Sequence, residues 1–448
     1  MTRRLRIGAG AGYSGDRIEP ALDLARRGEL DYLVFECLAE RTIALAQLAR
    51  VSDPQAGFDP LLADRLRSVL PDCAARGIRI VTNMGAANPI AAAQLAREIA
   101  TGLGLSGYKI AAVTGDDVLS SADLSNVDLD TGEGLDDLGD TIISANAYVG
   151  CAGIVDALQQ GADLVIVGRA ADPALYLGPL VHEFGWAMDD WDKLGKGTLA
   201  GHLMECAGQL TGGYFADPGV KDVERLDQLG FPIAEVNEDG DIELTKLPGT
   251  GGRLDEATVK EQLLYEIHDP ANYLQPDVVA DFSQVTVRSA GPDRVRVSGA
   301  TGKARPATLK ASVGYQNGFV GEGQISYAGA GALGRAELAR EIVTRRLQTI
   351  GLNPRETRTD LIGMNALHGP DFGTSAPPYE IRLRVVALTD SRRDAERIGE
   401  EVESLYTNGP AGGGGARKAV REMISVASCL IDRAAVITVS HLIAEGLQ

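Results

Sequence analysis

Short apolar segments alternate with helical segments from the start of the chain to Val167, and no other feature constrains the fold as strongly. The predicted strands are Leu5–Ala9, Tyr32–Cys37, Ile78–Thr82, Tyr108–Val113 and Leu164–Val167. Each is a mainly apolar run, which is typical of a strand buried on both faces of a parallel sheet. We therefore predict an α/β fold, with a mostly parallel sheet and helices on both faces.

Helical spacing fills the segments between these strands. The predicted helices are Pro20–Arg27, Arg41–Arg50, Pro60–Arg76, Pro89–Gly102 and Ile154–Gln160. Right-handed crossovers then place the loops that follow the strands at one edge of the sheet, where α/β proteins bind their ligands. These loops are Gly8–Asp16, Glu36–Glu40, Asn83–Asn88, Thr114–Asp117 and Gly168–Asp172. Because they are rich in Gly, Asn, Asp and Glu, we predict that they form the rim of an active site.

The pattern changes in the second half of the chain. Ile233–Lys246 has the alternation of a β-hairpin about a turn at Asp239-Gly240. The later predicted elements are strands Val285–Val287, Val295–Ser298, Leu309–Gly314 and Glu380–Thr389, and helices Ala336–Gly351, Arg392–Leu405 and Arg417–Ser428. We therefore predict two domains, an α/β domain over residues 1–277 that carries the rim and an α+β domain over residues 278–448 with a glycine-rich loop.

Composition excludes several classes of function. The chain has 62 acidic and 43 basic residues, a net charge of −19, and no basic patch, so nucleic acid is not an expected partner. The five cysteines are scattered and form no C-x-x-C pair, which favours reduced thiols in the cytoplasm. An apolar run of about 18 residues is absent, so we expect no membrane partner. A homo-oligomer stays open.

The first loop contains the pattern G-x-G-x-x-G in Gly10–Gly15, and Glu36 follows at the end of the next strand. This spacing resembles a dinucleotide-binding fingerprint, although the next helix begins later than that motif requires. Two alternatives are a loop whose backbone amides approach an anionic group and an ordinary turn. Gly10 and Gly12 are therefore candidate binding residues.

Two asparagines and an arginine–aspartate pair stand in the other loops. The Asn83 amide could hold a carbonyl or carboxylate, whereas Asn88 is either a helix N-cap or a binding residue. Arg169 could clamp a carboxylate or phosphate. Alternatively, Arg169 and Asp172 pair with each other, or Asp172 caps the helix that follows. Cys151 precedes a helix, and we favour core packing over a nucleophilic role.

His202 and Glu205 are three residues apart in a predicted helix within Gly197–Gly213. This spacing could serve an acid/base pair or a metal, but the second motif of a metal site is missing, so we predict no metal. The glycine-rich segment 408–417 is interpreted as an anion-binding nest formed by Asn408, Gly413 and Arg417, with a disordered surface loop as the alternative.

Several strings together resemble the acyclic terpene utilisation (AtuA) family. They are Gly8–Asp16, Val34–Thr42, Asn83–Pro89, Gly168–Pro173, His182–Trp186, Gly201–Gly213, Leu247–Gly252, Thr258–Tyr265 and Thr407–Arg417. The resemblance implies bacterial catabolism of branched acyclic terpenes through acyl-CoA intermediates, but no settled reaction. Longer relatives carry a small ferredoxin-like domain after this region, which implies a separately encoded partner of that kind.

The leading hypothesis is an enzyme that acts on a small carboxylate or acyl-CoA as a hydratase or lyase. Glu36 or Glu205 would be the base and His202 the acid, while Asn83 and Arg169 would hold the developing oxyanion. The alternatives are an NAD(P)-dependent oxidoreductase, which would use the loop that contains Gly10, and a non-catalytic acyl-CoA-binding subunit of a catabolic complex. The sequence identifies no cofactor.

Overall fold

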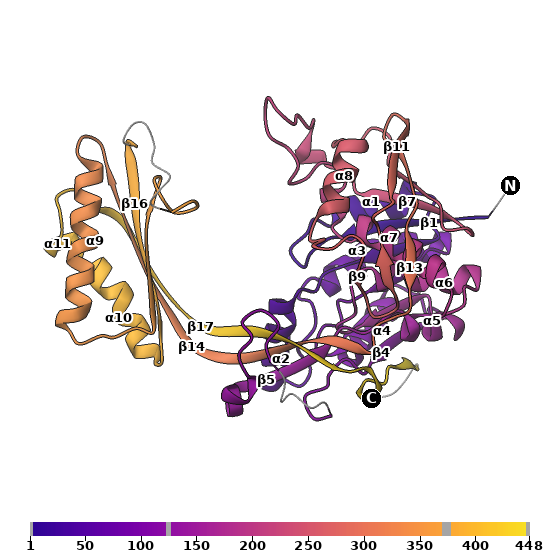
Figure 1. Ribbon diagram of the computed structural model, residues 1–448, viewed down its shortest axis with the longest axis horizontal. Helices are drawn as coiled ribbons and strands as arrows, with labels where there is room; N and C mark the ends of the chain where they lie inside the picture. Colours follow the sequence, from indigo (N-terminus) through magenta and orange to yellow (C-terminus); the bar gives the residue numbers. More distant parts are fainter. Residues whose placement is uncertain (1–2, 122–126, 370–377, 445–448) are drawn as a thin grey trace. The chain divides into compact units, whose positions relative to one another are not determined.

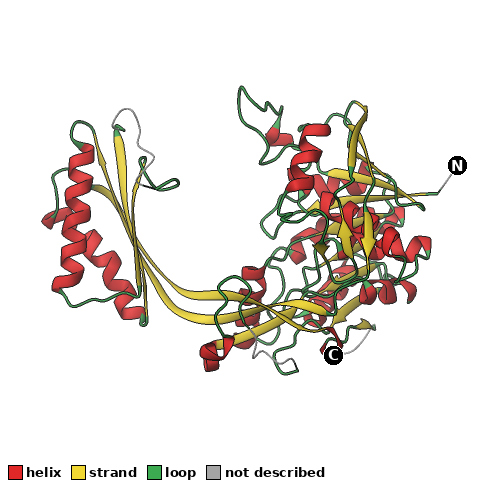
Figure 2. Ribbon diagram, in the orientation of Figure 1, coloured by secondary structure: helices red, strands yellow, loops and turns green. Residues whose placement is uncertain are grey.

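The computed structural model describes residues 3–121, 127–369 and 378–444, and the chain divides into two compact units (Figure 1). Unit 1 comprises residues 1–314 and 426–448, and unit 2 comprises residues 315–425. The strands β14 (Thr308–Ala328) and β17 (Gly414–Asp432) run from one unit into the other (Figure 2). Among the described residues, none of the helices is long and apolar enough to cross a membrane.

Within the described residues, unit 1 is built on a sheet of ten strands whose centre is parallel. The five central strands, in spatial order, are β1 (Arg4–Ala11), β2 (Tyr32–Phe35), β3 (Arg79–Thr82), β6 (Leu164–Val167) and β4 (Ile110–Thr114). All four residues of β2 and of β6 are buried, as their apolar sequences predict. The α/β prediction is confirmed. The sheet is mixed, because antiparallel strands extend it on both sides.

The antiparallel strands at the two sides of this sheet determine which later segments belong to unit 1. Those beside β1 are β7 (Pro232–Asn237), β8 (Ile242–Lys246), β12 (Arg294–Ser298) and β11 (Thr286–Gly291), and β18 (Val439–Leu442) lies beside β4. The sequence places a boundary at 277/278. The structure divides the chain elsewhere, because β11 and β12 hydrogen-bond into the sheet of unit 1 and β18 returns to it.

Two layers of helices cover the parallel strands. One layer comprises α1 (Glu19–Arg27), α3 (Leu62–Arg76) and α4 (Pro89–Gly102), and the other comprises α5 (Ala152–Gln159), α6 (Ala174–Phe184) and α7 (Trp191–Met204). The crossovers advance from β1 to β4 and then step back to β6, so right-handedness puts the second layer on the opposite face. The chain therefore leaves the neighbouring strands β3 and β6 toward opposite faces, which opens a crevice at their carboxyl ends.

A glycine contact brings α7 close to the start of α6. A Cβ on Gly201 would lie only 2.6 Å from the Cα and carbonyl oxygen of Pro173. Because both of these atoms belong to the backbone, a larger side chain would push the two segments apart. This close approach places the end of α7, which carries Glu205, beside the loop that carries Asp172.

Unit 2 has a sheet in the order β15 (Glu356–Ile362), β16 (Glu380–Thr389), β14 and β17, with helices α9 (Ala332–Thr349) and α10 (Arg392–Glu403) against it. The prediction of α+β structure in the second half is confirmed. The prediction of a helix at Arg417–Ser428 is wrong, because this segment is part of β17 and pairs with β14. Its good helix formers yield to the sheet contact.

Candidate active site

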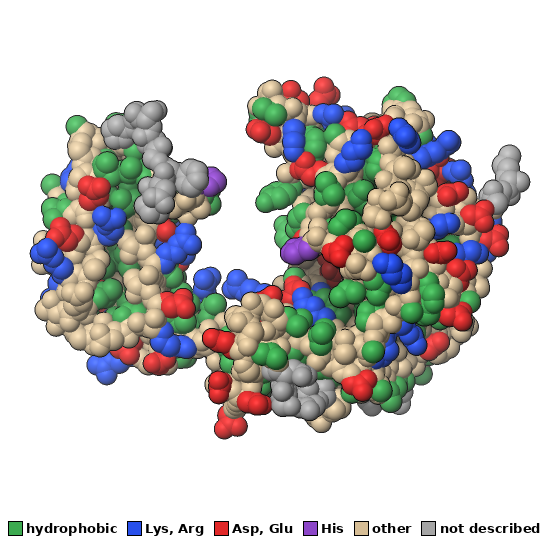
Figure 3. All heavy atoms as spheres, viewed as in Figure 1, with side chains coloured by type: hydrophobic (Ala, Val, Ile, Leu, Met, Phe, Trp, Pro, Cys, Tyr) green, Lys and Arg blue, Asp and Glu red, His purple; other side chains and the backbone are tan. Residues whose placement is uncertain are grey.

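A cavity of about 1190 Å³ opens at the carboxyl ends of the parallel strands, and every residue that lines it belongs to unit 1. Three of the five predicted rim loops line it directly, through Gly12–Arg17, Glu36–Glu40 and Arg169–Pro173. The hollow is bordered by charged and apolar side chains (Figure 3). The convergence predicted from the strand pattern is therefore present.

The loop after β3 lies behind the cavity wall and fixes Glu36. Asn83 is fully buried, its Oδ1 accepts a hydrogen bond from the Cys37 N–H at 2.7 Å, and its Nδ2 donates to Glu36 Oε1 at 2.9 Å. The Leu38 N–H also donates to Glu36 Oε1, at 2.8 Å. Asn83 does not line the cavity, since its amide is used within the protein. The amide of Asn83 therefore contacts Cys37 and Glu36 rather than the cavity.

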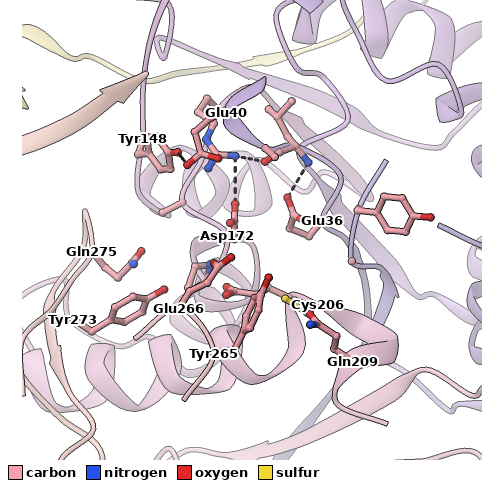
Figure 4. A pocket seen from close by; sticks show the side chains of 18 of the residues that line it. Glu36, Glu40, Tyr148, Asp172, Cys206, Gln209, Tyr265, Glu266, Tyr273 and Gln275 are labelled. Carbon is pink, nitrogen blue, oxygen red and sulfur yellow. Dashed lines mark hydrogen bonds and ion pairs between the residues drawn. The ribbon is translucent and has the colours of Figure 1, made fainter. Parts of the chain in front are cut away.

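The loop after β4 fixes Arg169 in a similar way. Asp116 Oδ2 accepts hydrogen bonds from the Arg169 N–H and from Asn146 Nδ2, both at 2.9 Å. The Arg169 guanidinium lies 3.9 Å from the centroid of the Tyr148 ring and donates to the Leu38 carbonyl oxygen. It lies 3.5 Å from Asp172 Oδ1, so the alternative in which these two residues pair is confirmed (Figure 4). Because Arg169 is only 2% exposed, it supplies a fixed positive charge rather than a free clamp.

Glu36 and Asp172 line the cavity and interact electrostatically. Burial and the charge of Asp172 raise the pKa of Glu36 well above its usual value, although the hydrogen bonds from Asn83 and Leu38 oppose the shift. Burial raises the pKa of Asp172 to about 6, although Arg169 opposes this shift. Both carboxyl groups therefore bind a proton more readily than exposed ones do. Two N–H groups donate to Glu36 Oε1, so Oε2 is the oxygen that is free to carry a proton.

Residues 5–442 match the family model described as acyclic terpene utilisation family protein AtuA. The chain belongs to this family. The match covers nearly the whole chain, and it confirms the resemblance seen in the sequence. No curated protein matches the chain.

Glu40 and Lys310 form a second charged pair on the cavity wall, and this pair was not predicted from the sequence. Glu40 begins α2 (Glu40–Ser52), and its Oε1 accepts hydrogen bonds from the Tyr148 hydroxyl and from Lys310 Nζ, the latter at 3.4 Å. Burial opposes its ionisation, but Arg169 and the Tyr148 hydroxyl lower the pKa of Glu40 to about 2. Glu40 stands in the predicted rim loop Glu36–Glu40, so its position in the sequence indicates that it could line the cavity. The sequence around Lys310 gives no such indication, because Lys310 is brought here by contacts with distant segments, among them the hydrogen bond from the Tyr148 N–H to its carbonyl oxygen.

The predicted acid His202 lies behind the predicted base Glu205. His202 is fully buried in α7 and does not line the cavity, whereas Glu205 lines it and is 6% exposed. His202 Nδ1 lies 3.1 Å from Glu205 Oε1. Burial lowers the pKa of His202 to about 4. A direct acid role for His202 is therefore corrected, because the ring has no access to a ligand in the cavity.

The loop that contains the glycine motif differs in geometry from a dinucleotide-binding loop. Gly10 packs on Phe35, where an added Cβ would lie 2.6 Å from the ring, and it does not line the cavity. Gly12 lines the cavity, and its N–H donates to Asp16 Oδ2 at 2.9 Å. The helix α1 begins only at Glu19, so its N-terminal amides do not follow the glycines directly.

The structure places five other predicted residues away from the cavity. Asn88 caps α4, as its Oδ1 accepts from the Ala91 N–H, while its Nδ2 donates to two backbone carbonyl groups, so it does not line the cavity. Cys151 is fully buried in the core, which confirms the packing interpretation. Asn408, Gly413 and Arg417 belong to unit 2, and none of them is among the residues that line the cavity.

The remaining wall of the cavity combines polar and apolar side chains. The polar ones in Figure 4 are Cys206, Gln209, Tyr265, Glu266, Tyr273 and Gln275. The apolar ones include Leu129, Leu226, Leu229, Leu274, Leu309 and Leu430. Among the described residues, no three His, Cys, Asp or Glu side chains are arranged to hold a metal ion. The site can accommodate an apolar chain beside a group of interacting carboxyl groups.

Proposed function

We propose that this protein is a catabolic enzyme that adds water to, or removes water from, an acyl thioester with an apolar chain. The observation that carries the proposal is the pair formed by Glu36 and Asp172 on one cavity wall. Arg169 lies beside Asp172 and favours its ionised form, whereas burial and the charge of Asp172 favour the protonated form of Glu36. An acid and a base side by side are what general acid–base catalysis requires. Membership of the acyclic terpene utilisation family supports a branched hydrocarbon chain.

The proposed step uses both members of the pair. Asp172 removes a proton from water, and the water oxygen bonds to the β-carbon of an α,β-unsaturated thioester. The electron pair of the double bond moves toward the thioester carbonyl, and Glu36 Oε2 gives its proton to the α-carbon. Elimination of water is the reverse of this sequence. No electrons are lost or gained overall, so the step needs no oxidant or reductant.

The charges around the cavity favour a thioester over a free carboxylate. The acidic residues that line it are Asp16, Glu36, Glu40, Asp172, Glu205 and Glu266, against the basic residues Arg17, Arg169 and Lys310. Arg169 and Lys310 are already paired with Asp172 and Glu40, respectively. An additional carboxylate would meet little uncompensated positive charge, whereas a neutral thioester carbonyl avoids this repulsion.

The direct test is incubation of the purified protein with a panel of unsaturated and β-hydroxy acyl-CoA esters, together with the matching free acids. We expect turnover of branched thioesters and little turnover of the acids. Thermal stabilisation by the esters without any turnover would instead support a non-catalytic acyl-CoA-binding subunit. Inertness in both assays would contradict the proposal.

The rate should depend on pH through Asp172. This carboxyl group must be ionised to act as the base, and its pKa is about 6. We therefore expect kcat/KM for the thioester to fall about tenfold for each pH unit below about 6, because the protonated fraction of the base grows in that proportion. A profile measured from pH 4.5 to 8 that stays flat across pH 6 would exclude Asp172 as the base.

The family resemblance also supports a small ferredoxin-like partner, which we propose as a companion chain encoded separately. Affinity purification of the tagged protein from its native extract tests this proposal. Recovery of the protein with no stoichiometric small companion would contradict it.

A further inference from the structure

The pair of His202 and Glu205 is a buried titratable group that the proposed step does not use. His202 is fully buried, with its ring centroid 5.5 Å from that of Tyr273 and 6.0 Å from that of Phe282. Its two nitrogens face two different oxygens. Nε2 lies 3.3 Å from the Leu263 carbonyl oxygen, and Nδ1 lies 3.1 Å from Glu205 Oε1.

These two contacts fix the number of protons in the pair. A carbonyl oxygen only accepts hydrogen bonds, so the proton on Nε2 of His202 is assigned by its contact with Leu263. The contact between Nδ1 and Glu205 Oε1 then needs one further proton. This proton lies either on Glu205, which makes the pair neutral, or on His202, which makes it an ion pair.

The surroundings favour the neutral form. Glu205 Oε2 is buried and has no hydrogen-bond partner among the described residues, and such an oxygen costs less in a carboxylic acid than in a carboxylate. Asp172 and Glu266 act electrostatically on Glu205 and oppose a further negative charge there. In the same direction, burial raises the pKa of Glu205 and lowers that of His202.

We infer that His202 and Glu205 share one proton as a neutral pair, and that this pair is a positioning unit that allows Asp172 to ionise. The neutral state of the pair does not depend on the proposed function, whereas its effect on Asp172 rests on that function. If Glu205 were ionised, its charge would raise the pKa of Asp172, because like charges disfavour each other. The ionisable groups that act on the pair or contact it are Arg169, Asp172, Cys206, Glu266 and Tyr273.

The state of the pair can be measured without an activity assay. In protein labelled with ¹⁵N-histidine, we expect His202 to show the neutral form with the proton on Nε2, unchanged from pH 6 to pH 8. The variant His202→Gln assigns the signal by its loss. An imidazolium signal at pH 7 would overturn the inference.

The variant Glu205→Gln tests the same point independently. A Gln amide can donate to His202 Nδ1 as a carboxylic acid does, so the unfolding temperature should change by less than about 2 °C. If the pair were ionic, this variant would leave a buried imidazolium without its partner, and a fall of more than about 6 °C is expected. A fall of that size would overturn the inference.

The variant Glu205→Gln also tests the effect on Asp172, because it removes any charge at position 205. If the pair is neutral in the wild type, the acidic limb of the pH–rate profile should stay near pH 6 in this variant. A limb that moves to lower pH would show that Glu205 is ionised in the wild type and would contradict the positioning role. Absence of any turnover would contradict the proposed reaction but not the neutral pair.

Discussion

Replacing Glu36 by Gln is expected to lower turnover at least about a hundredfold and, at the same time, to stabilise the fold at neutral pH. Gln can accept the hydrogen bonds from Asn83 and Leu38 at the position of Oε1, so the wall of the cavity should keep its geometry. The amide that replaces Oε2 has no acidic proton to give. The proposed step therefore loses its acid while the protein remains folded.

The gain in stability follows from the raised pKa of Glu36. In the unfolded chain this carboxyl group ionises above about pH 4.3, whereas in the folded protein it keeps its proton to a higher pH. The wild-type free energy of unfolding therefore falls with rising pH by up to about 1.4 kcal/mol per unit, and the fall ends above the folded pKa. Gln does not titrate, so the difference between variant and wild type should grow with pH across this window.

Urea unfolding at pH 4.5, 6 and 7.5, combined with rates on the best thioester, measures both effects. Glu98→Gln is the matched control, because Glu98 is exposed on α4 and does not line the cavity. It should change neither quantity. Retention of more than a tenth of the rate in the Glu36 variant would remove Glu36 from the reaction. A variant that is less stable than wild type at pH 7.5 would show that Glu36 is ionised in the fold.

The rim of the site could be predicted from sequence because it depends on local pattern. Buried parallel strands are continuous apolar runs, and right-handed crossovers send the loops after them to one edge. Glu36, Arg169 and Asp172 stand in such loops and do line the cavity. The contacts of Asn83 could not be predicted in this way. The strand pattern places a residue at the edge of the sheet, but it does not show whether the amide faces a ligand or a neighbouring loop.

Features that depend on contacts between distant segments could not be predicted. Lys310 reaches the cavity because the start of β14 pairs with residue 148, and nothing in its neighbourhood in the sequence indicates this. Burial of His202 depends on Tyr273 and Phe282, which come from later segments. The helix predicted at Arg417–Ser428 failed for the same reason. Its residues favour a helix in isolation, and pairing with β14 overrides that preference.

Arg65 joins the stability of unit 1 to the shape of the cavity. Its side chain is fully buried in α3, where Nη1 lies 3.3 Å from Asp59 Oδ1. Nη2 donates to the carbonyl oxygens of Tyr13, Ser14 and Asp16 at 3.3, 2.7 and 3.3 Å. Tyr13 and Asp16 line the cavity. One guanidinium therefore neutralises a buried carboxylate and holds the loop after β1 in place.

Replacing Arg65 by Met is expected to lower the free energy of unfolding by about 3–5 kcal/mol. Asp59 would lose its buried counter-charge, and three carbonyl oxygens would lose their donor. Arg65→Lys should recover only part of the loss, because a single ammonium group cannot bond Asp59 and three carbonyl groups together. Arg67→Met is the matched control, since Arg67 is exposed two residues away in α3 and its ion pair with Asp64 contributes little.

Urea unfolding of the three variants gives the comparison, and KM for the thioester measures the loop. We expect the folded fraction of the Lys variant to bind substrate more weakly, because the loop that contains Tyr13 and Asp16 is less firmly held. The Met control at position 67 should leave both quantities unchanged. A loss below about 1 kcal/mol in Arg65→Met would mean that the loop and Asp59 have other support, and that the cavity wall does not depend on this arginine.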